Sequence, residues 1–564
     1  YPNFAEMRKY TGYLKPRNFE IFRDSLRAHG MLDQARDFLI ASGKLQTLCY
    51  KEDIESALRT PGMGGFQLLD LHDFPGQGSA LVGVLDPFWE PKGYVTADAY
   101  RRFCHATVPL ARLPKRVFTT DEDLVADLDV AHYGPRPLDC ASLRWELVDD
   151  QGRAQARHTL PCPTIAPGNL LRIDTLRTGL GSLPAPARYR LVVSLENEAK
   201  PVAANRPLRG AARAVFENDW DIWVYPPRIT TSPSADVLVA DELSADAKTT
   251  LASGGKVLLL IPPSRVSPDP MRGRIALGLS TIFWNTAWTG RQPPHTLGIL
   301  CDPRHPALAD FPTESHSNWQ WWYLVSTAGA IILDDLPPRL RPTVQVIDDW
   351  FTNRKLGLVF EATLGPGKLV VSSIDLRGEL ESNPVARQFR HSLLRYMASD
   401  RFRPRVACTV EQIERLMAPL SNVQKLGGQI RQTDSAQPGH EAERALDGDP
   451  RTMWHTAWGD GAPGFPHEVQ IAFRDAVRLS GFRLTPRSDG NPNGTIKEYT
   501  FHVSADGQTW GEPVAQGAFP AGAAVQVVEF APTPPIRFVR LVALSGHAQG
   551  PWASIAEFDV TVAP

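Results

Sequence analysis

Near the end of the chain, a short acidic turn has the residue types of a calcium site. Asp447 and Asp449 lie on either side of a glycine, and Thr452 follows three residues later, so several oxygen atoms share one tight turn. Oxygen ligands of this kind suit a hard cation such as Ca²⁺. Because two carboxylates are few for a calcium cage, an ordinary solvated Asp-Gly-Asp turn remains the alternative.

The residues that must position this turn alternate in the way of half-buried strands. Phe482 and Leu484 are separated by a single residue, and so are Phe501 and Val503. This period of two is typical of a strand with one buried face. A hairpin turn is expected at residues 506–507, where an aspartate precedes a glycine. The region is therefore predicted to consist of short strands joined by tight turns.

Four segments of the last quarter carry a family resemblance, and they are residues 444–455, 481–484, 499–510 and 555–558. They resemble the discoidin, or coagulation-factor type C, module, a β-sandwich that bacteria often append to glycosidases as a carbohydrate-binding domain. Members of that family close a metal site with an acidic residue near the C-terminus, which Glu557 matches. The resemblance implies a discoidin-like domain over residues 423–564 and a structural Ca²⁺. The implied ligands are Asp447, Asp449, Thr452 and Glu557, and no organic cofactor is expected.

In discoidin-like sandwiches, loops at one end of the strands usually meet the ligand. The loops expected here carry two tryptophans, an arginine and two asparagines, which are Trp458, Trp552, Arg487, Asn491 and Asn493. A Trp platform beside Arg and Asn donors suits the apolar CH faces and dense hydroxyls of a sugar. The expected partner is therefore an oligo- or polysaccharide. Trp454 and Trp510 are expected in the core, and a core position is the alternative for Trp458 and Trp552.

Composition leaves room for several domains but indicates no chemistry. A chain of 564 residues predicts about three to five domains, and 43% hydrophobic content lets each bury a core. The 60 basic and 62 acidic residues balance, so nothing favours nucleic acid or an anionic membrane as a partner. No run of about eighteen apolar residues occurs, so no membrane span is expected. The cysteines lack C-x-x-C spacing, which argues against a zinc site.

The first 115 residues combine helices with one short apolar strand. Apolar residues at spacings of three and four predict helices over residues 17–59. Residues 64–71 are predicted to form a strand that delivers Asp70, His72 and Asp73 at its C-terminal end. A strand buried by helices, with polar groups at this end, is the layout of a barrel active site.

The stretch up to Leu113 resembles the last βα units of the catalytic barrel in family 2 glycoside hydrolases, the β-galactosidase and β-glucuronidase group. Residues 1–11 resemble the loop after the strand that carries the nucleophilic glutamate of those enzymes. The resemblance implies the C-terminal part of a (β/α)8 (TIM) barrel over residues 1–115, with apolar surface left exposed. Retaining glycosidases need two carboxyls, and neither can be matched here. No catalytic residue is therefore assigned, and both carboxylates are expected upstream of residue 1.

Side chains at the end of the predicted strand are candidates for sugar binding. Asp70, His72 and Asp73 are expected to form hydrogen bonds with sugar hydroxyls, and Trp89 is expected to stack on a ring. Structural roles are equally open, with Asp73 as a loop cap, His72 as a satisfied histidine and Trp89 as core. Asp70 and Asp73 as a substitute catalytic pair are a further alternative, although neighbours on one loop need not flank a glycosidic bond.

Short strands separated by Gly, Pro, Asn and Asp turns predict an antiparallel β-sandwich over residues 116–226. Family 2 glycosidases carry an immunoglobulin-like sandwich directly after the barrel, so the position of this region agrees with the resemblance.

Residues 227–405 alternate short apolar runs with helical segments, which predicts a parallel sheet covered by helices. The region resembles the flavodoxin-like, class I glutamine-amidotransferase-like domain that several glycosidases carry. Cys301 shares a loop with His305 and does not lie on a strand-to-helix elbow, so a non-catalytic structural or assembly role is expected. The aromatic cluster at residues 318–323 is expected to pack an interface, with sugar stacking as the alternative. Residues 406–422 are expected to be a linker.

These regions follow one another in the order of a multidomain glycosidase. We interpret the chain as the C-terminal portion of a bacterial glycoside hydrolase that acts on glycans or oligosaccharides by hydrolysing O-glycosyl bonds. The alternative is a non-catalytic carbohydrate-binding scaffold. The resemblance implies a secreted or periplasmic location, and oligomerisation stays open. Which sugar is bound does not follow from the fold, because one fold serves many chemistries.

Overall fold

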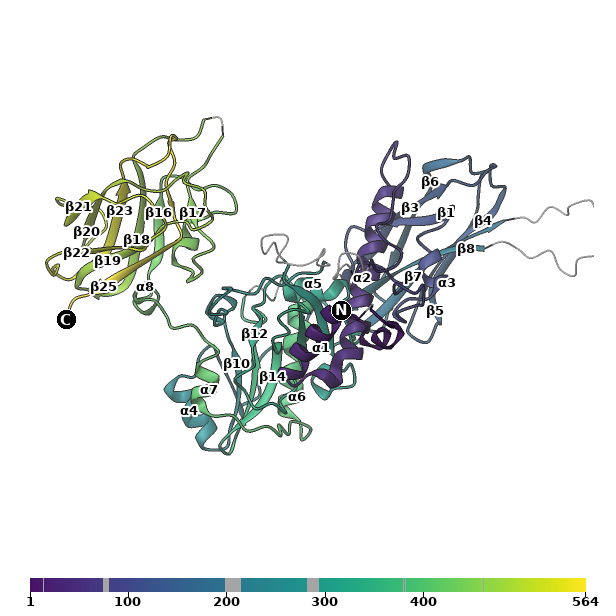
Figure 1. Ribbon diagram of the computed structural model, residues 1–564, viewed down its shortest axis with the longest axis horizontal. Helices are drawn as coiled ribbons and strands as arrows, with labels where there is room; N and C mark the ends of the chain where they lie inside the picture. The colour runs from purple at the N-terminus through teal and green to yellow at the C-terminus, as the bar shows by residue number, and fades with distance from the viewer. Residues whose placement is uncertain are drawn as a thin grey trace, which may run out of the picture. The chain divides into compact units, whose positions relative to one another are not determined.

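The computed structural model describes residues 1–13, 15–74, 81–197, 215–280, 294–378, 380, 382–459 and 461–564. The chain divides into two compact units, Tyr1–Met417 and Ala418–Pro564 (Figure 1). Unit 1 contains a helical region, a β-sandwich and a mixed sheet, and unit 2 is built of strands. Within the described residues, no helix has the length and apolar character that crossing a membrane requires.

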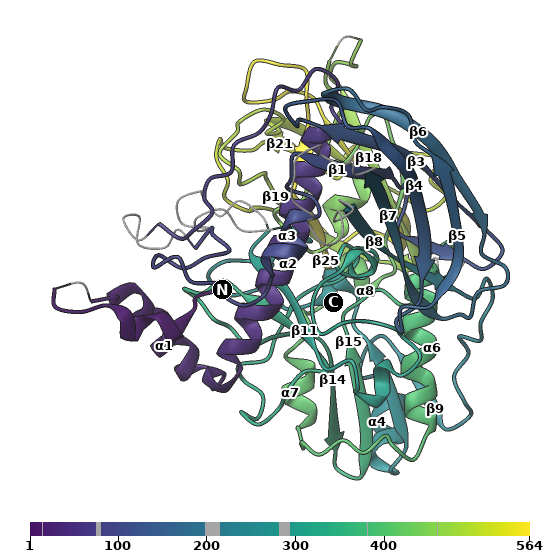
Figure 2. The same cartoon turned by 90° about the vertical axis from the view of Figure 1, so that its right-hand side faces the viewer.

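The start of unit 1 is helical. Its helices are η1 (Phe4–Lys9), α1 (Arg17–Ala28), η2 (Leu32–Gln34), α2 (Ala35–Leu58) and α3 (Ala97–Arg101). In α1, Phe19, Phe22 and Leu26 are buried at spacings of three and four, as the sequence predicted. Figure 2 shows α2 running beside the sandwich, and its buried Glu55 accepts a hydrogen bond from the Trp220 indole at 2.9 Å.

The barrel strand predicted over residues 64–71 is not formed, and the nearest pairing is an isolated bridge between His72 and Leu85. A strand needs a neighbour for its backbone hydrogen bonds. Among the described residues, this stretch has the hydrogen bond from the Leu85 N–H to the Leu71 carbonyl at 3.1 Å but no neighbouring strand. The structure therefore does not show a TIM barrel over residues 1–115. Phe66, Leu69 and Leu71 are exposed, so the expected apolar surface is present.

The sandwich of unit 1 packs two sheets around one core (Figure 2). Its strands are β1 (Thr107–Arg112), β2 (Val117–Thr119), β3 (Asp123–His132), β4 (Cys140–Val148), β5 (Ala154–Pro161), β6 (Gly168–Gly179), β7 (Ala187–Asn197) and β8 (Val215–Tyr225). The sheets have the orders β1-β3-β6 and β2-β8-β7-β4-β5, antiparallel except for the β2–β8 pair. The predicted sandwich is present, and β1 adds a strand before residue 116.

The second half of unit 1 is a seven-stranded sheet of order β11-β13-β14-β15-β10-β9, with β12 beside β14. Its strands are β9 (Val237–Ala240), β10 (Lys256–Leu260), β11 (Thr296–Cys301), β12 (Ile331–Ile332), β13 (Val344–Asp348), β14 (Leu356–Leu364) and β15 (Gly367–Ser372). The apolar runs on β9, β10 and β15 do pair in parallel, as predicted. The other strands pair antiparallel, so the sheet is mixed and not flavodoxin-like. Short connections such as Gly365-Pro366 between β14 and β15 can join only antiparallel neighbours.

Helices cover both faces of this sheet. They are α4 (Ala245–Ala252), η4 (Pro263–Arg265), η5 (Pro306–Leu308), α5 (Trp319–Val325), α6 (Pro384–Ala398) and α7 (Val410–Glu414). Phe389 of α6 belongs to the core on one face, and Phe360 of β14 belongs to the core on the other. The expected linker over 406–422 is wrong in its first part, because Cys408, Ile413 and Leu416 are buried in the second core.

Unit 2 is a β-sandwich, as the family resemblance implied. Its elements are α8 (Asn422–Lys425), β16 (Gln429–Thr433), η6 (Ala442–Leu446), β17 (Trp454–His455), β18 (His467–Val477), β19 (Leu479–Thr485), β20 (Glu498–Ser504), β21 (Ala515–Ala518), β22 (Gln526–Glu529), β23 (Ile536–Ala543), β24 (Ser554–Ile555) and β25 (Glu557–Val562). The sheets are β16-β18-β23-β20-β21, β22-β19-β25 and the short pair β17-β24.

The core of unit 2 is aromatic. The Phe482 ring lies 4.5 Å from that of Phe501 and 5.6 Å from that of Phe558, between the sheets that carry them. Trp454 is buried as predicted. Trp510 is not part of this core, because its ring is half-buried under the guanidinium of Arg540 at 4.7 Å.

Candidate functional site

Loops of unit 2 bring an exposed tryptophan together with two histidines. Trp458 is 46% exposed, and its ring centroid lies 5.4 Å from that of His440 and 4.9 Å from that of His455, both edge-on. The Trp458 backbone N–H donates to Oε1 of Gln437 at 3.0 Å, which fixes the indole's backbone. The result is an aromatic platform with polar rings along its side.

Arg487 is held beside this platform by its own loop. Its Nη1 donates to the Asn493 carbonyl at 2.6 Å, while Nε and Nη2 donate to the Asp489 carboxylate at 2.8 and 2.5 Å. These hydrogen bonds hold the pKa of Asp489 below its ordinary value, so the carboxylate is ionised at neutral pH. The positive charge of Arg487 adds to burial in lowering the pKa of His455.

His455 lies beside two backbone carbonyls, those of Thr456 and Asn493. Burial lowers its pKa, so the imidazole is neutral at pH 7. Nδ1 lies 2.7 Å from the Thr456 carbonyl, which can only accept, and the Asn493 carbonyl also lies against the imidazole. A Cβ on Gly494 would lie 3.0 Å from Nε2 and 2.9 Å from Oγ of Ser554, so only glycine leaves this space open.

Two buried polar atoms of this region lack a hydrogen-bond partner among the described residues. They are Nδ1 of His440 and Oγ of Ser554. Buried polar atoms are nearly always satisfied in folded proteins. Two such atoms in a region with an exposed indole are therefore expected to have a polar ligand or ordered water as partner.

The predicted sugar-binding residues divide into two groups. Trp458 contacts His440 and His455, and Arg487 acts electrostatically on His455. Asn491 and Asn493 shape the loop instead, since Oδ1 of Asn491 accepts the Asn493 N–H at 3.0 Å and Asn493 offers its carbonyl to Arg487. Trp552 is half-buried with its ring over Gly550, so neither a platform nor a core position describes it.

The acidic turn of unit 2 places oxygen atoms around one point. Oγ1 of Thr452 lies 2.7 Å from Oδ2 of Asp447, 3.0 Å from the Asp449 carbonyl and 3.5 Å from the Arg444 carbonyl. The carboxylate of Asp449 turns away and pairs with Arg451 at 2.9 Å, so this residue offers its carbonyl to the point and not the predicted carboxylate.

Glu557, the first residue of β25, lies close to Asp447 of the acidic turn. Its Oε1 is buried without a hydrogen-bond partner among the described residues. Burial, followed by the nearby carboxylate of Asp447, raises the pKa of Glu557 to about 9. A cation between the two carboxylates is one way to relieve this repulsion. In the part of the chain that the structure describes, no three His, Cys, Asp or Glu side chains converge, so such a site depends on hydroxyl and carbonyl ligands as well.

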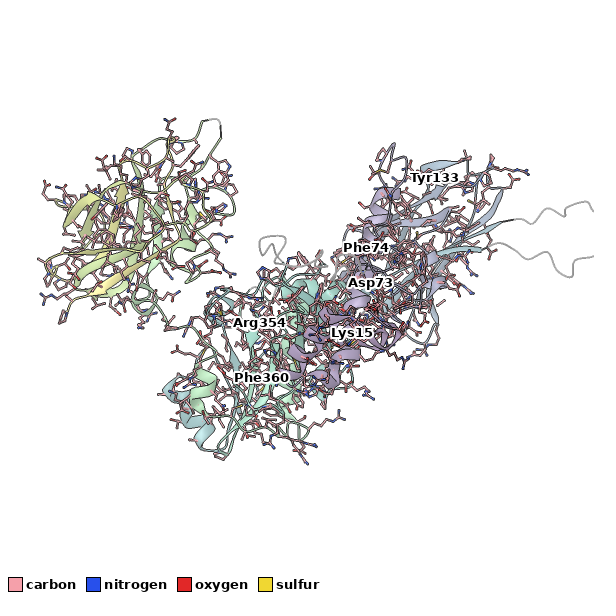
Figure 3. The ribbon with its side chains drawn as sticks, viewed as in Figure 1. Lys15, Asp73, Phe74, Tyr133, Arg354 and Phe360 are labelled. Atoms are coloured by element: carbon pink, nitrogen blue, oxygen red, sulfur yellow. The ribbon has the colours of Figure 1, made fainter. Side chains whose placement is uncertain are left out.

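The predicted sugar-binding residues of unit 1 are arranged differently. Asp73, labelled in Figure 3, is buried. Its Oδ1 accepts from Nζ of Lys92 at 2.6 Å and from the Gly83 N–H at 3.0 Å. His72 directs Nδ1 to the Asp73 carbonyl at 2.7 Å, and its ring lies 4.6 Å from that of Trp89. Trp89 is 62% exposed and therefore not core. Because Asp73 is held in an ion pair, it is unsuited to form a catalytic pair with Asp70.

Sequence reasoning missed a buried glutamate in this region. Glu6 of η1 is fully buried, and neither carboxyl oxygen has a hydrogen-bond partner within the described residues. Burial, with Asp73 as the next contribution, raises the pKa of Glu6 to about 8. The carboxyl is therefore protonated at neutral pH. A glutamate among polar neighbours in a helical segment gives no sequence signal for such burial.

Three stretches of the chain match known family models. Residues 429–558 match the F5/8 type C domain. This match confirms the discoidin resemblance for that region. Residues 122–226 and 238–418 match two domains of unknown function, DUF8488 and DUF8487. Their resemblance to family 2 glycosidase and amidotransferase domains therefore gains no support.

Curated relatives are similar over about a quarter of the chain. A galactose oxidase of Gibberella zeae is 39% identical over 147 residues, which are 26% of this chain and 22% of that protein. A sialidase of Micromonospora viridifaciens is 36% identical over 135 residues, 23% of this chain and 21% of that protein. The chain thus covers about a fifth of the length of these relatives.

Solved structures also match about a quarter of this chain, and the match covers nearly the whole of those structures. One is a carbohydrate-binding module of Clostridium perfringens in complex with GalNAc-β-1,3-galactose, 29% identical, covering 25% of this chain and 99% of that chain with a TM-score of 0.23. Another is the C-terminal domain of a chitobiase from Bacteroides fragilis, 28% identical, covering 26% of this chain and 99% of that chain with a TM-score of 0.22.

His440 and His455 are the pocket residues that sequence reasoning did not select. They are fifteen positions apart, and the His455 backbone N–H donates to the His440 carbonyl at 3.2 Å. This hydrogen bond, with a second from the Gln437 N–H to the His455 carbonyl at 2.9 Å, places both rings beside Trp458. The signal available in the sequence was the position of His455 directly after Trp454, at the end of the discoidin motif.

Proposed function

We propose that unit 2 is a carbohydrate-binding module whose pocket is formed by Trp458, His440, His455 and Arg487. A sugar ring lays its CH face on the indole of Trp458. Sugar hydroxyls accept from the remaining N–H groups of Arg487, and one forms a hydrogen bond with the imidazole of His455. The observation that carries the proposal is the exposed indole in a region where Nδ1 of His440 and Oγ of Ser554 are buried without partners.

The comparisons support the class of ligand. Residues 429–558 match the F5/8 type C domain, and two partial relatives are named a galactose oxidase and a sialidase. Those names refer to enzymes of sugars, which favours a glycan as the partner of this chain. The sugar residue and the linkage stay open.

We also propose a structural Ca²⁺ in unit 2. The carboxylates of Asp447 and Glu557, the hydroxyl of Thr452 and the carbonyls of Arg444 and Asp449 would hold it, which is the hard oxygen set that Ca²⁺ prefers. The cation would tie the turn after η6 to the first residue of β25. The unpartnered Oε1 of Glu557 supports this assignment.

Activity of the whole chain is a second, finer proposal. The partial match to a sialidase favours a role in a bacterial glycoside hydrolase over a purely structural role, and a secreted or periplasmic location would follow from it. The carboxylate pair considered in unit 1, Asp70 and Asp73, is not available, because Oδ1 of Asp73 is held by Lys92. We therefore expect the 564-residue chain to leave aryl glycosides intact. Turnover abolished by Asp73→Asn would contradict this.

Glycan binding is tested on the full chain with a glycan array followed by titration. Arg487→Ala should abolish binding while the circular dichroism spectrum is unchanged, because the substitution removes the donors but no core residue. Arg483→Ala is the matched control, since Arg483 is an exposed arginine on β19. Binding that survives Arg487→Ala, or no binding to any glycan, would contradict the proposal.

A further inference from the structure

The loop that carries Arg487 folds around the carboxylate of Asp489. Besides the two hydrogen bonds from Arg487, Oδ1 of Asp489 accepts the Asn491 backbone N–H at 3.2 Å. The Asn493 carbonyl takes a third nitrogen of Arg487, Nη1, at 2.6 Å. The guanidinium is thus fixed in position before any ligand arrives.

In this arrangement the carboxylate of Asp489 neutralises the positive charge of Arg487, and Arg487 remains a hydrogen-bond donor. A guanidinium has five N–H groups, and the loop uses part of them, so others remain for sugar hydroxyls. Its side chain is 9% exposed, whereas that of Asp489 is 46% exposed, so the carboxylate lies on the solvent side of the pair. The other titratable groups of the pocket are the imidazoles of His440 and His455, and the latter is neutral at pH 7.

Asp489 also occupies the place that an acidic sugar would need. Arginine binds carboxylates through two parallel N–H···O bonds, and Asp489 makes this fork-like contact with Nε and Nη2 of Arg487. A sugar carboxylate would have to displace Asp489 or approach a second negative charge. A neutral sugar needs neither, because a hydroxyl uses a single N–H.

We propose that Asp489 is a specificity-determining residue that makes the pocket of unit 2 select neutral sugars over sugars that carry a carboxylate. This inference rests on the proposed carbohydrate binding. Removing one unit charge several ångströms from a solvent-accessible ligand changes affinity about three- to tenfold. Asp489→Asn should therefore improve binding of acidic sugars by about this factor relative to neutral ones.

The test compares matched neutral and acidic sugars on the full chain. The probes are methyl β-galactoside against methyl β-galacturonide, and methyl β-glucoside against methyl β-glucuronide, titrated at pH 7 in low and in high salt. Wild-type protein should prefer the neutral member of whichever pair binds. Asp489→Asn should shrink or reverse this preference, most strongly in low salt, because charge interactions are screened by salt.

Two further variants separate charge from loop structure. Asp489→Glu keeps the charge and should keep the preference. Asp475→Asn removes an equal charge from an exposed position on β18, and it should leave the preference unchanged. Asparagine at 489 retains an oxygen for the Asn491 N–H, and the melting temperature reports whether the fold is intact.

The outcomes are distinct. If Asp489→Asn weakens neutral and acidic sugars by the same factor, Asp489 only supports the loop and the inference is wrong. Equal binding of neutral and acidic sugars by wild-type protein also overturns it. If no probe binds to any variant in either salt while the array finds a neutral glycan ligand, the inference fails alone; if the array also finds none, the proposed carbohydrate binding fails with it.

Discussion

Both units contain a group of the same four residue types, but the two groups differ in their environment. In unit 1, Trp89 lies beside His72, and Asp73, the next residue in the sequence, forms an ion pair with Lys92. In unit 2, Trp458 lies beside His455, and the Arg487–Asp489 pair is near that histidine. Each group has an indole, an imidazole, a carboxylate and a cation.

The two groups differ in how deeply their polar atoms are buried and in whether these atoms already have partners within the protein. The side chains of Lys92 and Asp73 are each 3% exposed, and their ion pair is directed into the protein. In unit 2 the pair is open on the Asp489 side, and Nδ1 of His440 has no hydrogen-bond partner among the described residues. A set of residue types typical of a sugar site therefore becomes a candidate site only where donors and acceptors are left for a ligand.

Breaking the two ion pairs should give very different losses of stability. Lys92→Met leaves the buried Asp73 carboxylate unpaired and should lower the free energy of unfolding by about 3–5 kcal/mol. Asp489→Ala breaks a partly exposed pair and should cost about 1 kcal/mol or less. Urea denaturation followed by tryptophan fluorescence measures both. Similar losses in the two variants would remove the distinction between a structural and a functional pair.

The pH dependence of stability should sharpen the description of unit 1. The pKa of Glu6 is raised from 4.5 to about 8 in the folded protein, so the native state keeps a proton that the unfolded chain has released. The free energy of unfolding therefore falls as pH rises from about 4.5 to about 8. Glu6→Gln stays neutral and should remove this fall, gaining about 2–4 kcal/mol at pH 8 relative to wild type.

Denaturation of wild type and Glu6→Gln at pH 5 and pH 8 measures this difference. Glu20→Gln is the control, since Glu20 lies on the partly exposed side of α1. A gain of the same size at both pH values would mean that Glu6 does not hold its proton in the native state.

Calcium should stabilise unit 2 but not unit 1. A ligand at a hundred times its Kd stabilises the state that binds it by about 2.7 kcal/mol. Calcium should raise the melting temperature of the transition that belongs to unit 2, EDTA should reverse the increase, and Asp447→Ala should remove the response. Asp475→Asn removes a charge elsewhere on unit 2 and should respond like wild type. A melting curve indifferent to calcium and chelator would leave residues 447–452 as an ordinary turn.

Local sequence patterns correctly predicted those strands whose formation depends on the residues nearby in the sequence. The alternation of Phe482 and Leu484 predicted a strand of unit 2, and the apolar runs on β9, β10 and β15 predicted parallel neighbours. Residues 64–71 have an equally good strand pattern and form no strand. The difference is the presence of a pairing partner, which no local pattern reports.

The candidate site was predictable only in part for the same reason. Trp458 and Arg487 were found because sugar recognition favours their residue types on loops. His440 and His455 meet through a backbone hydrogen bond across fifteen positions, and Asp73 meets Lys92 across nineteen. Whether a polar side chain is free or committed depends on such long-range contacts, so sequence treated the two tryptophan groups alike.

The most direct test of the central claim is sugar titration of the full chain and two tryptophan variants. Wild type should bind a glycan selected on the array with saturable isothermal titration calorimetry, at one site per chain. Trp458→Ala should weaken binding about tenfold or more, because the stacking platform is lost, and Trp89→Ala should bind like wild type. Binding that survives Trp458→Ala, or that is lost in Trp89→Ala, would contradict the assignment of the site to unit 2.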